Sequence, residues 1–109
     1  MSPMNHETLD RRSLYMHMHV AACLRAHPER LAEAAATLAR WRATADERVQ
    51  PALAEWAAIL DQGLEPTLAA ALEPSEEGDR LRQSSPLLGL LNPRERWSLL
   101  RAFKELHAA

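Results

Sequence analysis

Seven prolines and three glycines stand at intervals along the 109 residues and divide the chain into short segments filled with Ala, Leu, Arg and Glu. Those four residue types favour helix, whereas proline and glycine mark the places where helices begin or end. No segment shows the alternation of polar and apolar residues that is typical of a strand. We therefore predict an all-α fold, a compact bundle of five to six short helices without a sheet.

The length of the chain is sufficient for one hydrophobic core. We expect a single helical domain over residues 1–109, in which residues 1–9 are a disordered or loosely packed N-terminus. Apolar residues make up 47% of the chain, but much of this is alanine, and the aromatic residues total only 5%. Burial of apolar surface stabilises a fold by about 25 cal/mol per Å², and alanine buries little area. A core of this kind often gains further stability from a partner or a second copy.

The helix boundaries follow from the punctuation. The first helix is predicted over about residues 10–26, and it is apolar around most of its circumference, as is typical of a central helix. Pro28 begins a second helix that ends near residues 46–50, and Pro51 begins a third that ends at Gly63. Two further short helices are predicted over residues 66–73 and 75–81.

The last helix has the best defined start. Asn92 is placed to cap it, with Pro93 at the first helical position and Glu95 at the third. We expect Trp97, Leu100 and Phe103 to face inward from this helix, because they recur at helical spacing.

The formal charge is -2, and the pI is near 6.2. This argues against a nucleic-acid binder, because contact with phosphates needs clustered positive charge. The charge is uneven, however: residues 61–79 hold six acidic residues and no basic one, whereas residues 94–104 hold four basic residues against Glu95 alone. A modest basic patch on the last helix is predicted. The candidate contacts to nucleic acid are Arg94, Arg96, Arg101 and Lys104.

Cysteine usage and hydropathy indicate the compartment. A single cysteine, Cys23, cannot form an internal disulfide, and the N-terminal residues lack the apolar stretch of an export signal. No apolar run approaches the roughly 18 residues of a membrane span. We expect a cytoplasmic protein without a membrane segment.

His19, Cys23 and His27 recur every four residues, the spacing at which successive helical turns present nitrogen and sulfur ligands to zinc. Positions eight apart are separated by about 12 Å along a helix axis, so the two histidines cannot share one ion. No second pair of ligands with this spacing occurs in the sequence. We therefore expect no metal ion, and we interpret this face as a helix surface with a small buried thiol.

Catalysis is not predicted either. A nucleophile at Ser84, Ser85 or Cys23 needs a base, an orienting acid and an oxyanion site, and the sequence does not supply these together. The glycines do not form a phosphate-binding loop, and the acidic residues of 73–79 lack the spacing of a calcium loop. We predict a protein that is not an enzyme and that takes no cofactor.

Residues 83–92, the sequence QSSPLLGLLN, are here called the bend. The paired serines and Pro86 must end the preceding helix, and the leucines that follow have two interpretations. They fill the gap between the short helices and the last one, or they form a surface for a partner, because exposed apolar patches on small domains tend to mark interfaces. The candidate partner-binding residues are Arg82, Pro86, Leu87, Leu88, Leu90, Leu91 and Trp97.

Three stretches of the chain carry a family resemblance. They are SLYMHMHVAACLRAHPERLAEAAATLARW, then W..IL..G, and finally LRQSSPLLGLLNPRERWSLLRAF. Together they resemble a group of small all-helical bacterial proteins encoded in toxin-antitoxin operons. In that group an aromatic residue often follows the Ser-Pro pair, whereas this chain has Leu87.

The resemblance implies an antitoxin, a cytoplasmic protein without catalytic activity that binds a cognate toxin encoded by an adjacent gene and blocks its active site. It also implies a contribution to repression of its own operon. The acidic residues of 73–79 are suited to a basic cleft on that toxin. The alternatives are a small helical DNA-binding transcriptional regulator and a non-enzymatic adaptor, and a homo-oligomer is compatible with each of them.

Overall fold

The computed structural model of the chain describes residues 5–106. Within that range the chain forms six α-helices and two short 3₁₀ turns, and it forms no strand. The prediction of an all-α fold is confirmed. In chain order the elements are α1 (His6–Ala26), η1 (Pro28–Arg30), α2 (Leu31–Thr44), α3 (Gln50–Asp61), α4 (Leu64–Ala71), α5 (Glu76–Arg82), η2 (Leu87–Leu90) and α6 (Pro93–Leu106).

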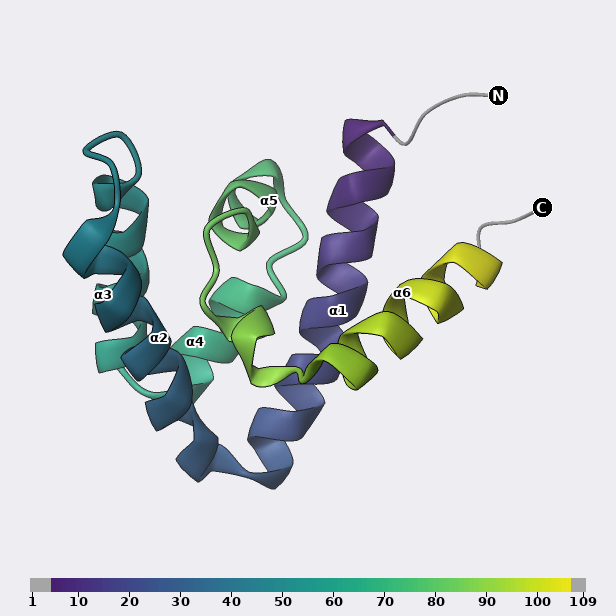
Figure 1. Cartoon of the computed structure of the whole chain (residues 1–109), viewed down its shortest axis with the longest axis horizontal. Helices are drawn as coiled ribbons and strands as arrows, with labels where there is room; N and C mark the ends of the chain where they lie inside the picture. The colour runs from purple at the N-terminus through teal and green to yellow at the C-terminus, as the bar shows by residue number, and fades with distance from the viewer. Residues whose placement is uncertain (1–4, 107–109) are drawn as a thin grey trace.

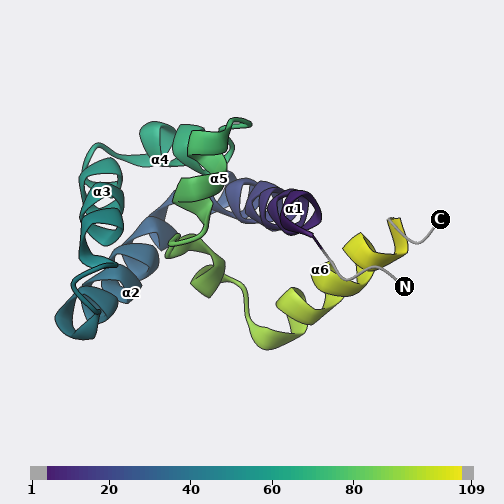
Figure 2. The same cartoon turned by 90° about the horizontal axis from the view of Figure 1, so that it is seen from above.

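The long helix α1 is central, as its apolar circumference predicts, and it contacts α4, α5, η2 and α6. The α2–α3 hairpin and α1 form the two arms of a V, and α5 lies between them (Figure 1). Figure 2 shows α6 on the side of α1 away from α3. The last helix is thus the most peripheral element of the bundle.

The core lies between α1, the α2–α3 hairpin, α4 and η2. Its largest fully buried apolar side chains are Trp56, Leu24, Leu68 and Leu87. Smaller residues such as Ala34 and Ala71 fill the remaining positions, so the helices approach one another closely. No residue of α6 belongs to this cluster.

Helix α1 begins at His6, four residues earlier than the sequence pattern indicated. Asn5 caps it, since its Oδ1 accepts a hydrogen bond from the Thr8 backbone N–H at 2.9 Å. Of the N-terminus predicted to be disordered or loosely packed, His6 to Leu9 are helical with mostly exposed side chains, and residues 1–4 lie outside the described range. The cap satisfies a backbone donor that would otherwise have no partner in the helix.

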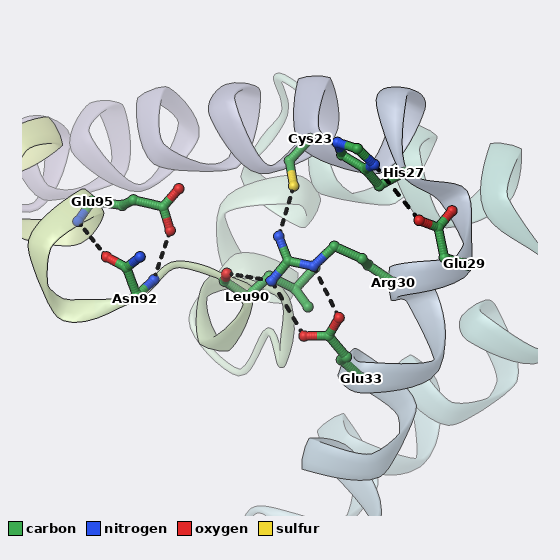
Figure 3. A network of polar contacts seen from close by, with 8 residues as sticks. All are labelled: Cys23, His27, Glu29, Arg30, Glu33, Leu90, Asn92 and Glu95. Atoms are coloured by element: carbon green, nitrogen blue, oxygen red, sulfur yellow. Dashed lines mark hydrogen bonds and ion pairs between the residues drawn. The ribbon is translucent and has the colours of Figure 1, made fainter.

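The predicted start of the last helix is confirmed. The Asn92 side chain accepts from the Glu95 backbone N–H at 2.8 Å, and the Glu95 carboxylate accepts from the Asn92 N–H at 2.9 Å. Figure 3 shows this reciprocal pair beside the bend. Ser75 caps α5, because its Oγ accepts a hydrogen bond from the Gly78 N–H. These local motifs fix where α5 and α6 begin.

Two glycines have positions that other residues would not tolerate. Gly63 joins α3 to α4 with a φ of 109°, a conformation that side-chain-bearing residues rarely adopt. Gly78 lies so close to the backbone of Glu73 that a Cβ atom there would stand 1.9 Å from the Glu73 carbonyl oxygen. The absence of a side chain at Gly78 lets the chain fold back tightly between α4 and α5.

Candidate protein-binding surface

The bend is mostly interior. Pro86, Leu87 and Leu90 are buried, while Leu88 and Leu91 are half-buried and pack against the core. The prediction that Pro86, Leu87 and Leu90 bind a partner is therefore wrong, because their side chains already fill the space between α1, α2 and the short helices. Of the two interpretations of the bend, the structure supports the one in which its leucines complete the core.

Arg82 is also wrong as a partner-binding residue. Its side chain is buried, and its guanidinium donates to the carbonyl oxygens of Ala71 and Glu73 at 3.0 and 2.7 Å and to the Asp79 carboxylate at 2.6 Å. The remaining donor, Nε, has no partner among residues 5–106. A buried guanidinium is stable only when it is paired and hydrogen-bonded in this way, so Arg82 ties the end of α5 to the end of α4.

A buried His17–Ser85 pair joins α1 to the bend, and sequence reasoning missed it. The His17 Nδ1–H donates to the Ser13 carbonyl oxygen at 2.7 Å, which leaves Nε2 as the acceptor for the Ser85 hydroxyl at 2.9 Å. The same hydroxyl oxygen accepts from the Leu87 N–H at 3.0 Å. Both side chains are buried and fully committed to these bonds, so the pair holds the bend in place and is not open to a substrate.

Burial lowers the pKa of His17 to about 4, against an ordinary value of 6.5. The hydrogen bond to Ser13 opposes this shift, and the nearby Arg82 charge adds to it. The histidine is therefore neutral in the folded chain near pH 7, which agrees with the hydrogen-bond pattern.

We expect the stability of the chain to fall as the pH drops from about 6.5 toward 4. Unfolded His17 takes up a proton in this range and folded His17 does not, so its contribution is complete above pH 6.5 and is lost on acidification. The loss should approach about 3 kcal/mol, from the 1.36 kcal/mol of each pKa unit. Urea unfolding of wild type and His17→Gln between pH 7 and about 5 measures the first part of this loss, about 2 kcal/mol.

In that experiment the His17→Gln variant should show a flatter pH dependence than wild type. His19→Gln is the matched control, because His19 is exposed on the same helix, and it should keep the wild-type slope. Equal slopes for wild type and His17→Gln would contradict this account of the buried pair.

Trp97 is the one predicted partner-binding residue that is fully available. The expectation that it faces inward is wrong: its side chain is 64% exposed, whereas Leu100 is half-buried and Phe103 is buried. Phe103 packs against α1, with its ring centroid 5.7 Å from that of Tyr15. Leu106, further along α6, is 70% exposed. Helix α6 thus rests on α1 at one buried side chain and leaves much of its apolar surface uncovered.

A groove of about 550 Å³ lies between α1 and α6 and is here called the α1–α6 groove. It is more apolar than polar along its walls, and three of its side chains are cations. The lining residues are Arg12, Trp97, Leu100, Arg101, Phe103, Lys104 and Glu105. An apolar groove with charged edges on a helix that the core does not cover is typical of a surface for another protein.

The four cations of α6 do not act together. Arg94, Arg101 and Lys104 are exposed and lie within about 80° of one another around the helix, from the 100° step between residues. Arg96 points back to the bend, where its guanidinium donates to the Leu88 carbonyl oxygen at 2.9 Å. The basic patch that the sequence predicts therefore consists of three residues, and Arg96 has a structural role.

The predicted zinc candidates are held apart by other contacts (Figure 3). Cys23 accepts a hydrogen bond from Arg30 at 3.0 Å, and the His27 ring faces Glu29 at 3.6 Å. His19 contacts the ring of Tyr15 instead. In the described part of the chain, no group of three or more His, Cys, Asp or Glu side chains is placed to hold a metal ion.

Arg30 is the centre of the contacts in Figure 3. Besides Cys23, it binds the Glu33 carboxylate and donates to the Leu90 carbonyl oxygen at 2.9 Å. The hydrogen bond between Arg30 and Glu33 raises the pKa of the arginine and lowers that of the glutamate, so both stay charged. Arg30 thereby connects α1, α2 and the end of the bend.

The acidic residues of 73–79 are less available than the sequence indicates. Asp79 is paired with Arg82, and Glu77 shares Arg80 with Glu55. Between residues 5 and 106 no helix has the length and hydropathy to cross a membrane. Among the described residues, the α1–α6 groove offers unpaired charge next to apolar side chains, as does a groove between α2 and α3 that contains Arg42 and Asp61.

Comparison with protein-family models, with curated proteins and with solved structures finds no match for this chain.

Proposed function

We propose that the chain is an antitoxin-like protein, which binds a cognate toxin encoded by an adjacent gene and neutralises it. In this proposal the toxin contacts α6 and the α1–α6 groove, while the bend serves as internal scaffold. The proposed partner surface is therefore α6, the helix that follows the bend, and not the leucines of the bend.

The observation that carries the proposal is the exposure of Trp97 on a well-capped helix. Tryptophan is among the residues that contribute most to binding energy when they fill a partner's pocket, and leaving one in water is unfavourable. Its neighbour Leu100, which is half-buried, extends the apolar surface into the groove. Because α6 contributes nothing to the main core cluster, a partner can cover its free face without disturbing the fold.

The small core supports the same proposal. A partner that binds only the folded chain stabilises it by mass action. We therefore expect the melting temperature of the chain to rise in the complex.

Replacing Trp97 with alanine should weaken binding of the adjacent gene product at least tenfold, while changing the free energy of unfolding by less than about 0.5 kcal/mol. The physical reason is that the indole is exposed in the free chain and becomes buried against the partner. Isothermal titration calorimetry with the purified partner measures the affinity, and co-expression in cells measures neutralisation as restored growth.

Trp41→Ala is the matched control, because Trp41 is also partly exposed, at 39%, but lies near the C-terminal end of α2. It should bind and neutralise like wild type. Equal loss in the two variants, or no binding of the adjacent gene product to wild type, would refute the proposed function.

A further inference from the structure

We infer that the α1–α6 groove takes an amphipathic helix of the partner, whose apolar side chains enter the groove and whose flanking side chains are acidic. This inference deepens the proposed function and rests on it for the claim that the occupant belongs to a protein.

The groove has the apolar elements that such a helix needs. Phe103 and Leu100 line it from α6, and Trp97 is a large side chain beside them. A helix docks in a groove through apolar residues three, four and seven positions apart, all on one face. A volume of about 550 Å³ provides space for several such side chains.

The charge at the edges of the groove selects an acidic occupant. Arg12 comes from α1, whereas Arg101 and Lys104 come from α6, so cations stand on both sides. None of the three has an ion-pair partner within residues 5–106, and Glu105 is the single acidic residue in the lining.

Several exposed arginines elsewhere on the surface form ion pairs. Arg11, Arg25, Arg48 and Arg80 are exposed and each lies within 4 Å of a carboxylate. Arg40 and Arg42 on α2 are also exposed and form no ion pair within residues 5–106, but the unpaired cations of the groove come from two helices and lie beside Trp97, which is 64% exposed. Carboxylates flanking a bound helix would complement the cations of the groove, which raises the association rate and disfavours basic competitors.

Two other occupants fit less well. A second copy of this chain docked by two-fold symmetry would bring the same cations against the groove, which like-charge repulsion opposes. A nucleic-acid strand could meet Arg94, Arg101 and Lys104 through its phosphates, but Leu100 and Phe103 offer phosphates nothing. An acidic amphipathic helix uses both the cations and the apolar lining.

The inference is tested by nuclear magnetic resonance on the full chain with two synthetic peptides. Each peptide is an amphipathic helix of about four turns with leucines on one face. One carries glutamates beside the leucines, and the other carries lysines at the same positions. The indole N–H signals report the site, because Trp97 lies at the groove, Trp41 lies on α2 and Trp56 is buried in the core.

The glutamate peptide should shift the Trp97 signal, leave the Trp41 and Trp56 signals unmoved, and bind at least tenfold more tightly than the lysine peptide. The double variant Arg101→Glu/Lys104→Glu should reverse this preference. The double variant Arg40→Glu/Arg42→Glu, which changes the net charge by the same amount on α2, should keep it. Equal binding of both peptides, or a shift of Trp41 alone, would overturn the inference.

Further measurements separate this inference from the proposed function. A uridine oligonucleotide that shifts Trp97, when the glutamate peptide does not, overturns the inference in favour of nucleic acid. If the adjacent gene product binds wild type and Arg101→Glu/Lys104→Glu equally, the inference fails and the proposed function stands. If that product does not bind but the glutamate peptide behaves as expected, the proposed function fails, and the assignment of the groove to an acidic amphipathic helix stands.

Discussion

Replacing Arg82 with alanine will destabilise the folded chain by about 3–5 kcal/mol, because it removes one partner of a buried ion pair. The substitution leaves the Asp79 carboxylate, which is itself largely covered, without its cation, and it leaves the carbonyl oxygens of Ala71 and Glu73 without a donor. Small domains are stable by only about 5–15 kcal/mol, so the variant will be near the limit of folding. Urea unfolding followed by circular dichroism measures the change.

Arg80→Ala is the matched control for this prediction. Arg80 is two residues away on the same helix, and it also binds carboxylates, those of Glu55 and Glu77, but its side chain is exposed. Exposed pairs contribute about 0–1 kcal/mol, so the control should unfold almost like wild type. A similar midpoint for both variants would show that Arg82 does not tie α5 to α4.

Trp56→Ala should have an effect of the same size, about 3–5 kcal/mol, because Trp56 is the largest fully buried side chain and its loss leaves a cavity in the core. Its indole N–H also donates to the Leu81 carbonyl oxygen at 2.8 Å, which joins α3 to the end of α5. Thermal unfolding should show a fall of many degrees in the melting temperature.

Two further variants separate the contributions of Trp56. Trp56→Phe keeps a ring in the core but removes the indole hydrogen bond to the Leu81 carbonyl oxygen, which still accepts from the Ser84 N–H, so it should cost less than Trp56→Ala and more than a surface substitution. Trp97→Ala removes an exposed tryptophan and should leave the melting temperature nearly unchanged. A large fall for Trp97→Ala, or none for Trp56→Ala, would contradict the assignment of core and surface.

The helices could be predicted because their signals are local. Asn92 with Glu95, and Ser75 before α5, are recognisable within four residues of sequence, and their side chains make the bonds that the motif requires. The apolar pattern predicts a start for α1 that is four residues too late, because the pattern begins after the helix does. Asn5 is followed by three polar residues, so α1 begins without an apolar residue that would indicate a helix.

The inward and outward faces of α6 could not be read from spacing alone. Trp97, Leu100 and Phe103 are three residues apart, and each such step falls about 60° short of a full turn. Over two steps the difference is about 120°, so when Phe103 points at α1, Trp97 points to solvent. Which of the three is buried depends on how α6 meets α1, and that is a tertiary contact.

The buried polar residues were missed for a related reason. His17 and Ser85 are 68 positions apart, and Arg82 reaches back to the end of another helix. The sequence offered a weak signal, since His17 lies between the apolar residues Met16 and Val20 on a central helix, where a polar side chain needs a partner. It did not indicate which residue that partner is.

Hydrogen exchange of the chain, alone and bound to the adjacent gene product, tests the central claim most directly, namely that α6 meets the partner while the bend is internal. The account predicts new protection of the amides in α6 and in the first half of α1, with those of residues 85–91 protected to the same extent in both samples. New protection confined to the end of the α2–α3 hairpin near Trp41, with α6 exchanging as in the free chain, would contradict it.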